Sequence, residues 1–167
     1  MSFSNVVSLA DHAAKIGNAL RKINGKIALI SHYDADGICA ASLLYSAFQD
    51  RGKDVDLIFL KQLDRDTIKE LENVDASAYV FSDLGSGQLT TIREFFGEEA
   101  NIVVVDHHQP QDEKWHNLHH LNPYHFGIDG SMEISGAGMA YILSRTISKR
   151  VRELIDLTVV GAFADMQ

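Results

Sequence analysis

The chain has 167 residues, of which 46% are hydrophobic, so it is long enough to bury the core of one globular domain. It has no apolar run of the roughly 20 residues that a membrane span requires, and its start does not resemble a secretory signal. The single cysteine, Cys39, excludes an internal disulfide framework and favours a reducing, cytoplasmic location. The net charge of −8 argues against broad binding to a phosphate backbone, which needs clustered lysine and arginine.

Helical and strand patterns alternate along the first two thirds of the chain. Apolar residues recur at helical spacing over 5–23, and Asn24-Gly25 ends that helix. Short apolar runs rich in branched residues predict buried strands at 26–30, 55–60, 78–81 and 101–105. Helices are expected between these strands, after Gly37 and at 65–72 and 89–96.

Residues beyond 110 are predicted to form a loop with short turns, followed by helices at about 136–149 and 151–164. Strands that alternate with helices are typical of βα units. We therefore expect an α/β fold with a mainly parallel sheet of about four or five strands and helices on both faces.

Three of the predicted strands lead into aspartates. Asp34 and Asp36 follow the first strand, Asp83 the third and Asp106 the fourth. In an open α/β sheet, ligands bind beyond the carboxyl ends of the strands, so these side chains are expected to meet at one edge. Two carboxylates about 4 Å apart repel by roughly 4 kcal/mol at an effective dielectric near 20, so this cluster needs protons or cations.

Divalent cations compensate such a cluster best. Oxygen ligands with one or two imidazoles favour Mn²⁺ or Mg²⁺ over zinc. Two such ions about 3.5–4 Å apart activate a water and stabilise charge on a phosphoryl group. A single aspartate after a strand often only caps a helix or forms a turn, but four of them beside His107 and His108 favour a metal site.

Other ligand-binding motifs fail on detail. Asp34-Ala35-Asp36-Gly37 lacks the third ligand and the later glutamate of an EF-hand loop, and no Gly-Lys-Ser/Thr sequence of a phosphate-binding loop occurs. Gly85-Ser86-Gly87 has only half of a dinucleotide-binding fingerprint. Ser135-Gly136-Ala137-Gly138 is either a phosphate site at a helix N-terminus or a simple N-cap, which we favour. The histidines of the loop, at 116, 119, 120 and 125, show no ligand spacing and are expected to be solvated or structural.

Four segments in order resemble the motifs of the DHH phosphoesterases, most closely the RecJ-like group and particularly the archaeal RecJ-like nucleases. These segments are His32-Tyr33-Asp34-Ala35-Asp36-Gly37, Ser82-Asp83, Asp106-His107-His108 and Gly161-Ala162-Phe163-Ala164-Asp165. The likeness spans residues 26–167, so the resemblance implies that residues 1–167 form one DHH-type catalytic domain.

The resemblance also implies a role for each residue. One metal ion would be held by Asp34 and Asp83, with His32 as a further ligand, although His32 lies closer to the first aspartate than in many family members. The other ion would be held by Asp36, Asp83, His107 and Asp165, which makes Asp83 the bridge. Asp106 is expected to orient His107, since metal-bound imidazoles need a hydrogen-bond partner. His108 is expected to contact the scissile phosphate or assist proton transfer.

Family members usually continue into a C-terminal substrate-binding domain, which residues 1–167 do not contain. We therefore expect either a fragment of a longer protein, which we favour, or a minimal DHH domain.

The activity that the resemblance implies is two-metal hydrolysis of a phosphodiester, as an exonuclease on single-stranded DNA or RNA or on short oligonucleotides. Alternatives within the enzyme class are a small-nucleotide phosphatase and a cyclic-dinucleotide phosphodiesterase. An alternative from another class is a RecJ-like structural partner of the replicative helicase, within a replication complex. No membrane partner is expected.

Overall fold

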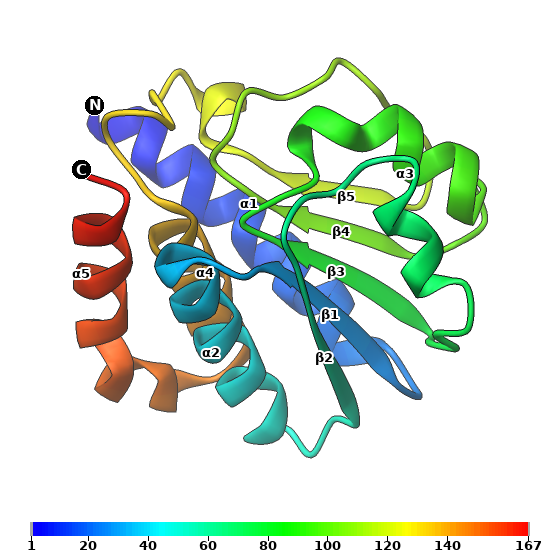
Figure 1. Ribbon diagram of the computed structural model, residues 1–167. Coiled ribbons are helices and arrows are strands. Elements are labelled where there is room, and N and C mark those ends of the chain that lie inside the picture. The colour runs from blue at the N-terminus through cyan, green and yellow to red at the C-terminus, as the bar shows by residue number, and fades with distance from the viewer. Residues whose placement is uncertain (1, 167) are drawn as a thin grey trace.

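The structure is a computed structural model that describes residues 2–166. Its centre is one parallel sheet with the strand order β2-β1-β3-β4-β5 (Figure 1). The strands are β1 (Ile27–His32), β2 (Val55–Leu60), β3 (Ala78–Ser82), β4 (Ile102–Val105) and β5 (Leu118–Leu121). The central strands are almost entirely buried and mostly apolar, because helices cover both faces of the sheet.

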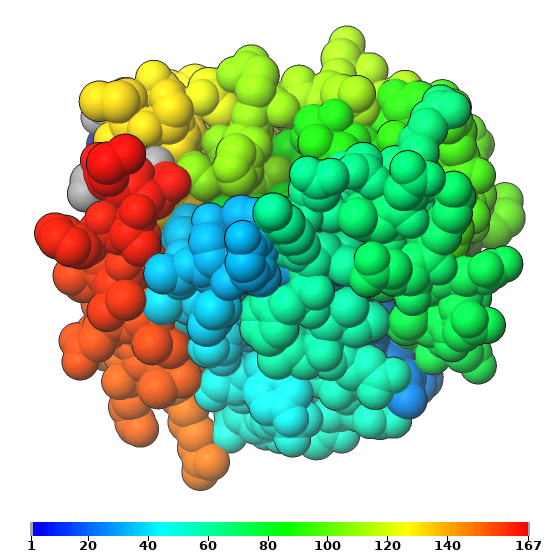
Figure 2. Space-filling model, in the orientation of Figure 1, coloured from blue at the N-terminus to red at the C-terminus, as the bar shows by residue number. Residues whose placement is uncertain are grey.

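One face of the sheet is covered by three helices, α1 (Phe3–Lys22), α2 (Ala35–Gln49) and α4 (Gly136–Ile147). The last helix, α5 (Ile155–Ala164), packs outside them against α2 and α4. Figure 2 shows α5, in orange to red, at the surface beside α2, in blue to cyan. No helix within residues 2–166 is long and apolar enough to cross a bilayer.

The opposite face of the sheet carries a smaller layer. It consists of α3 (Leu89–Phe96) and the 3₁₀ turn η1 (Thr67–Leu71), and it encloses a second apolar cluster around Phe81. The remaining 3₁₀ turns are η2 (Ser86–Gln88), η3 (Pro123–Phe126) and η4 (Lys149–Leu154). The expected α/β fold with a parallel sheet and helices on both faces is confirmed.

The main difference from the sequence prediction is β5, which was expected to be loop. Its sequence, Leu-His-His-Leu, has apolar residues only at its ends, so the strand pattern is weak. The strand forms because its backbone pairs with β4 at the edge of the sheet, from Ile102↔Leu118 to Val105↔Leu121. Two predicted helices are also shorter than expected: 65–72 contains only η1, and η4 precedes α5 where one helix was predicted.

The core between α2 and the sheet provides a stability prediction. Leu44 is fully buried in α2, whereas Ile38 in the same helix is 46% exposed. Leu44→Ala is expected to lower the free energy of unfolding by about 2–5 kcal/mol, because it removes buried methyl groups and leaves a cavity. Ile38→Ala, the control, is expected to change it far less. Denaturant titrations followed by circular dichroism measure both, and equal losses would contradict this packing.

Candidate metal centre

All eight residues singled out in the sequence lie at the carboxyl edge of the sheet. His32 ends β1, Asp34 is the N-cap of α2, and Asp36 lies in the first turn of that helix. Parallel pairing continues one residue past β3 and β4, because the backbone N–H of Asp83 donates to Val105 and that of Asp106 donates to Leu121. Asp165 closes the edge from the end of α5.

Within residues 2–166, three groups have ligand atoms within 4.8 Å of one another. They are His32–Asp34–Asp83, Asp36–His107–Asp165 and Asp83–Asp106–His107–His108. The first two groups contain the residues predicted to hold the two ions, except that Asp83 is absent from the second group. Asp83 lies between them, since its Oδ1 is 3.3 Å from His107 Nε2 and its Oδ2 is 3.8 Å from His32 Nδ1.

His32 presents one particular nitrogen to the aspartates. Its Nε2 lies 2.9 Å from the carbonyl oxygen of Lys61, which only accepts hydrogen bonds, so Nε2 carries the proton. Nδ1 then faces Asp34 Oδ2 at 2.8 Å with a lone pair. Two lone-pair atoms at this distance need a second proton or a cation between them.

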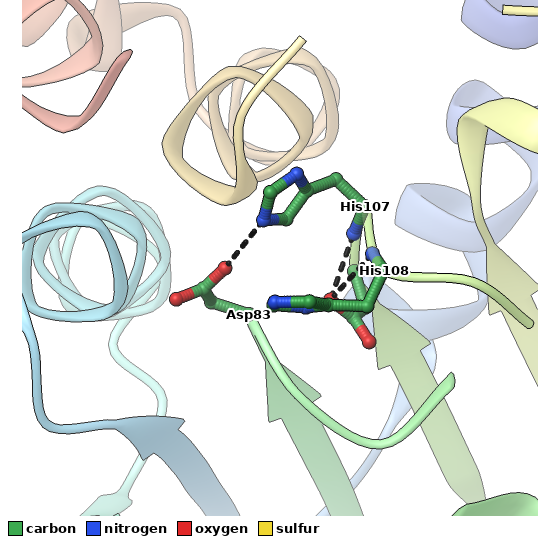
Figure 3. A group of neighbouring side chains, drawn as sticks. Asp83, His107 and His108 are labelled. Carbon is green, nitrogen blue, oxygen red and sulfur yellow. Dashed lines mark hydrogen bonds and ion pairs between the residues drawn. The ribbon is translucent and has the colours of Figure 1, made fainter. Parts of the chain in front are cut away.

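His107 is arranged in the same way with its nitrogens exchanged. Nδ1 lies 2.7 Å from the carbonyl oxygen of Gly130, so it donates, and Nε2 points to Asp83 (Figure 3). Oδ1 of Asp83 is buried and accepts no hydrogen bond from the described residues. A buried carboxylate oxygen that faces an imidazole nitrogen needs a proton or a cation between the two atoms, and this is the chemistry of a cation site. The residues present therefore fit divalent cations.

Asp36 is buried and already has partners. Its Oδ2 accepts from the backbone N–H of Gly136 at 2.7 Å, and its Oδ1 accepts from that of Ala137 at 2.9 Å. These are the first N–H groups of α4, so the positive end of the helix dipole faces the carboxylate. Ser135 caps the helix through the N–H of Gly138, which confirms the N-cap interpretation of this segment.

Asp106 contacts the ring of His108 and not, as expected, the ring of His107. Its Oδ1 accepts from Nδ1 of His108 at 2.7 Å, and the ring of His107 is held by Gly130 instead. Asp106 also accepts from the backbone N–H groups of Ser86, His107 and His108. The expectation that Asp106 orients the His107 ring is therefore wrong, because a carboxylate at the end of β4 lies beside the second histidine.

Burial and charge set the pKa values at this edge. Burial raises the pKa of Asp83 to about 7, and the charges of Asp36 and Asp106 add to this effect against the opposing contact with His107. Burial acts to lower the pKa of His107, but Asp83 and Gly130 outweigh it and raise the value to about 9. Burial also acts to raise the pKa of Asp106, but its hydrogen bonds, first from His108, lower it to about 2.

Asp165 is partly exposed, and its Oδ2 lies 3.7 Å from Nδ1 of His107. Burial raises the pKa of Asp165; the charge of His107 opposes this shift, and the charge of Asp36 adds to it. Asp165 therefore lies near the Nδ1 side of the His107 ring, and its carboxylate is within 4.8 Å of ligand atoms of both His107 and Asp36.

Residues 26–162 match the family model described as the DHH family, N-terminal domain. The chain belongs to the DHH family. It is thus a RecJ-like α/β domain of a metal-dependent phosphoesterase superfamily.

The relatives that match are longer than this chain. An uncharacterized protein of Methanocaldococcus jannaschii is 34% identical over 149 residues, which cover 86% of this chain and 33% of that protein. The single-stranded-DNA-specific exonuclease RecJ of Thermus thermophilus is 26% identical, over 95% of this chain and 25% of that protein. A crystal structure of exonuclease RecJ bound to manganese superposes with a TM-score of 0.71 at 25% identity, over 94% of this chain and 43% of that chain. The chain thus spans a third or less of these curated relatives.

Residues that no sequence motif marked surround the candidate ligands. A cavity of about 420 Å³ beside the cluster is lined by His32, Asp83, Asp106 and His108 and by a polar rim. The rim contains Lys61, Gln62, Gln88 and Gln109, which come from the loops after β2, β3 and β4. In the sequence, the only indication that these rim residues lie near the site is their position just after predicted strands. The carbonyl partners Lys61 and Gly130 left no signal in residue type at all.

The approach of α4 to this edge provides a second prediction. A Cβ atom at Gly136 would overlap Oδ1, Cγ and Cβ of the buried Asp83, whereas a Cβ at Gly87 would only reach ordinary contact distance. Gly136→Ala is therefore expected to lower the free energy of unfolding by about 1–3 kcal/mol, as overpacking does. Gly87→Ala is the control and is expected to stay within about 0.5 kcal/mol of the parent. Thermal and denaturant unfolding measure both, and a neutral Gly136→Ala would contradict the close approach.

Proposed function

We propose that this chain carries the catalytic centre of a two-metal phosphodiesterase that acts on single-stranded nucleic acid or short oligonucleotides. The observation that carries the proposal is the paired arrangement of His32 and His107. Each donates one ring N–H to a backbone carbonyl and turns the other nitrogen to buried or half-buried aspartates.

One cation would be held by His32 Nδ1, Asp34 and Asp83, and the other by Asp36, Asp83, His107 and Asp165. Mn²⁺ or Mg²⁺ suits this oxygen-rich set with one imidazole at each site. When bound, such a pair of ions activates a water and neutralises charge on a phosphoryl group. The crystal structure of RecJ bound to manganese supports the choice of Mn²⁺.

His108 is the residue best placed to act on the substrate. Its Nδ1 is held by Asp106 at 2.7 Å, and this hydrogen bond raises the pKa of the ring. The side chain of His108 is about half exposed and lines the cavity together with Asp83. Because Nδ1 is held by Asp106, Nε2 is the nitrogen that remains available to a substrate. A protonated ring there donates to a phosphate oxygen or to the leaving oxygen. Asp106 is thus a positioning residue for His108.

The polar rim of the cavity favours a nucleotide over a small inorganic phosphate. Gln62, Gln88 and Gln109 offer amide donors and acceptors that suit the edges of bases and sugars, and Lys61 adds a positive charge. The likeness to a single-stranded-DNA-specific exonuclease supports a single-stranded substrate. The small-nucleotide phosphatase, the cyclic-dinucleotide phosphodiesterase and the helicase-partner role stay as alternative predictions.

The proposal predicts that the protein binds Mn²⁺ and shortens a labelled single strand. Asp83→Asn is expected to abolish both, because the variant removes the shared charge but keeps a residue type that tolerates the positive φ of 58° at this position. Asp11→Asn, on the exposed face of α1, is the control and is expected to keep both. His108→Gln is expected to bind Mn²⁺ and to cleave about 10²- to 10⁴-fold more slowly. Undetectable Mn²⁺ binding at millimolar concentration would overturn the two-metal proposal.

Metal binding is also expected to release protons. With a pKa of about 7 for Asp83 and about 9 for His107, both groups are mostly protonated at pH 6, whereas cations bind only their deprotonated forms. Mn²⁺ affinity should therefore rise from pH 6 to pH 8, while the release falls from about two protons to about one. Titration calorimetry in buffers of different ionisation enthalpy measures this release. An affinity that does not change with pH would contradict the assignment of these two ligands.

A further inference from the structure

A chain of polar side chains lies behind Asp106 and His108, and no step proposed above uses it. Ser86 and Asn122 are fully buried, and His120 is partly buried beside them. Ser86 follows β3, His108 follows β4, and Asn122 directly follows β5, so three neighbouring strands bring these residues together.

Backbone groups fix the orientation of the Asn122 amide. The N–H of Tyr124 must donate, so the Asn122 atom 3.0 Å from it is the oxygen Oδ1. The carbonyl oxygen of His108 must accept, so the Asn122 atom 2.8 Å from it is the nitrogen Nδ2. Nδ2 donates its second proton to Oγ of Ser86 at 2.8 Å. All the hydrogen-bonding groups of this amide are therefore assigned from backbone donors and acceptors.

The direction of the remaining bonds follows from this assignment. Ser86 Oγ accepts from Asn122, and its own proton has one remaining partner among the described residues, Nε2 of His120 at 2.8 Å. His120 must then be neutral, with its proton on Nδ1, which lies 3.2 Å from Nε2 of His125. Burial, which lowers the pKa of His120 to about 4, agrees with a neutral ring.

We propose that Asn122, Ser86 and His120 form a one-directional hydrogen-bond chain that positions His108 and Asp106 for catalysis. The chain reaches the segment after β4 through Asn122, which donates to the backbone carbonyl of His108. The backbone N–H of Ser86 donates to Asp106 Oδ2 at 2.9 Å beside it, so the position of the Ser86 backbone also bears on Asp106. The three residues are positioning residues, because they touch the site only through Asp106 and His108. Their effect on catalysis rests on the proposed function, whereas the direction of the chain does not.

The tautomer of His120 is a test that requires no activity. Long-range ¹H–¹⁵N NMR of the histidine rings is expected to show Nδ1–H for both His120 and His125 at pH 7, assigned by comparison with His120→Gln and His125→Gln. Free histidine prefers Nε2–H, so this result would not arise by default. Ser86→Ala is expected to return His120 towards Nε2–H. An Nε2–H or doubly protonated His120 in the parent protein would overturn the proposed chain.

The kinetic test separates positioning from metal binding. Ser86→Ala and Asn122→Asp are expected to lower kcat by about tenfold to 100-fold, the usual effect of losing a partner that orients a catalytic group. KM and Mn²⁺ affinity should stay within about twofold, because neither residue contacts a proposed metal ligand or the cavity. Asn122→Asp keeps the oxygen that accepts from Tyr124 and loses both N–H donors. His119→Gln, the neighbouring position in β5, is the control and is expected to keep the parent kcat.

The outcomes distinguish the two proposals. A parent protein that binds no Mn²⁺ and cleaves nothing refutes the proposed function, while the tautomer measurement still decides the hydrogen-bond chain. An active parent whose Ser86→Ala variant keeps full kcat refutes positioning and leaves the function intact. If Asn122→Asp does not fold by circular dichroism, Ser86→Ala decides alone, since it deletes a single oxygen atom.

Discussion

The burial of three carboxylates at one edge of a parallel sheet is the constraint on which the rest of this structure depends. Asp36, Asp83 and Asp106 are each at most 2% exposed, and ionised carboxylates are costly to bury without compensation. Asp106 is compensated by four donors, and Asp36 by the first two amides of α4. Asp83 has an oxygen that receives no hydrogen bond from the described residues. Asp106 is thus fully compensated by the protein, whereas Asp36 and Asp83 keep lone pairs for the proposed cations.

This compensation explains why two helices of the last third approach the sheet so closely. The amides of α4 reach Asp36 only because position 136 is glycine, since a Cβ there would overlap Asp83. The same applies to α5, where a Cβ at Gly161 would overlap Asp36 Oδ1 and the side chain of Ala137. Close packing against the carboxylates therefore requires small residues on both helices, and it also carries Asp165 to the edge.

The sequence could predict which residues lie at the carboxyl ends of the strands, but few of the hydrogen-bond partners of those residues. Apolar runs that end in aspartate predicted the edge, and the two groups of possible ligands around His32 and His107 lie there. The strand at 118–121 was not predicted, because its two central histidines give no apolar strand pattern and the strand forms only by backbone pairing with β4. The contact between Asp106 and His108 was missed too, since the order of residues does not say which of two adjacent rings a carboxylate meets. Partners that act through backbone carbonyls, at Lys61 and Gly130, leave no trace in residue type.

The adjacent histidines have different partners, which suit the two roles proposed for them. Both rings lie on the side of Asp83, with centroids 4.3 Å apart, yet their hydrogen bonds separate them (Figure 3). A neutral carbonyl holds Nδ1 of His107 and turns Nε2 towards Asp83, so that Nε2 becomes a possible metal ligand once it loses its proton. A carboxylate holds Nδ1 of His108 and favours its protonated form, as a proton donor requires. The partner of Nδ1 therefore sets the direction of each ring: with Nδ1 of His107 held by Gly130, its Nε2 faces the buried aspartates, and with Nδ1 of His108 held by Asp106, its ring lines the cavity.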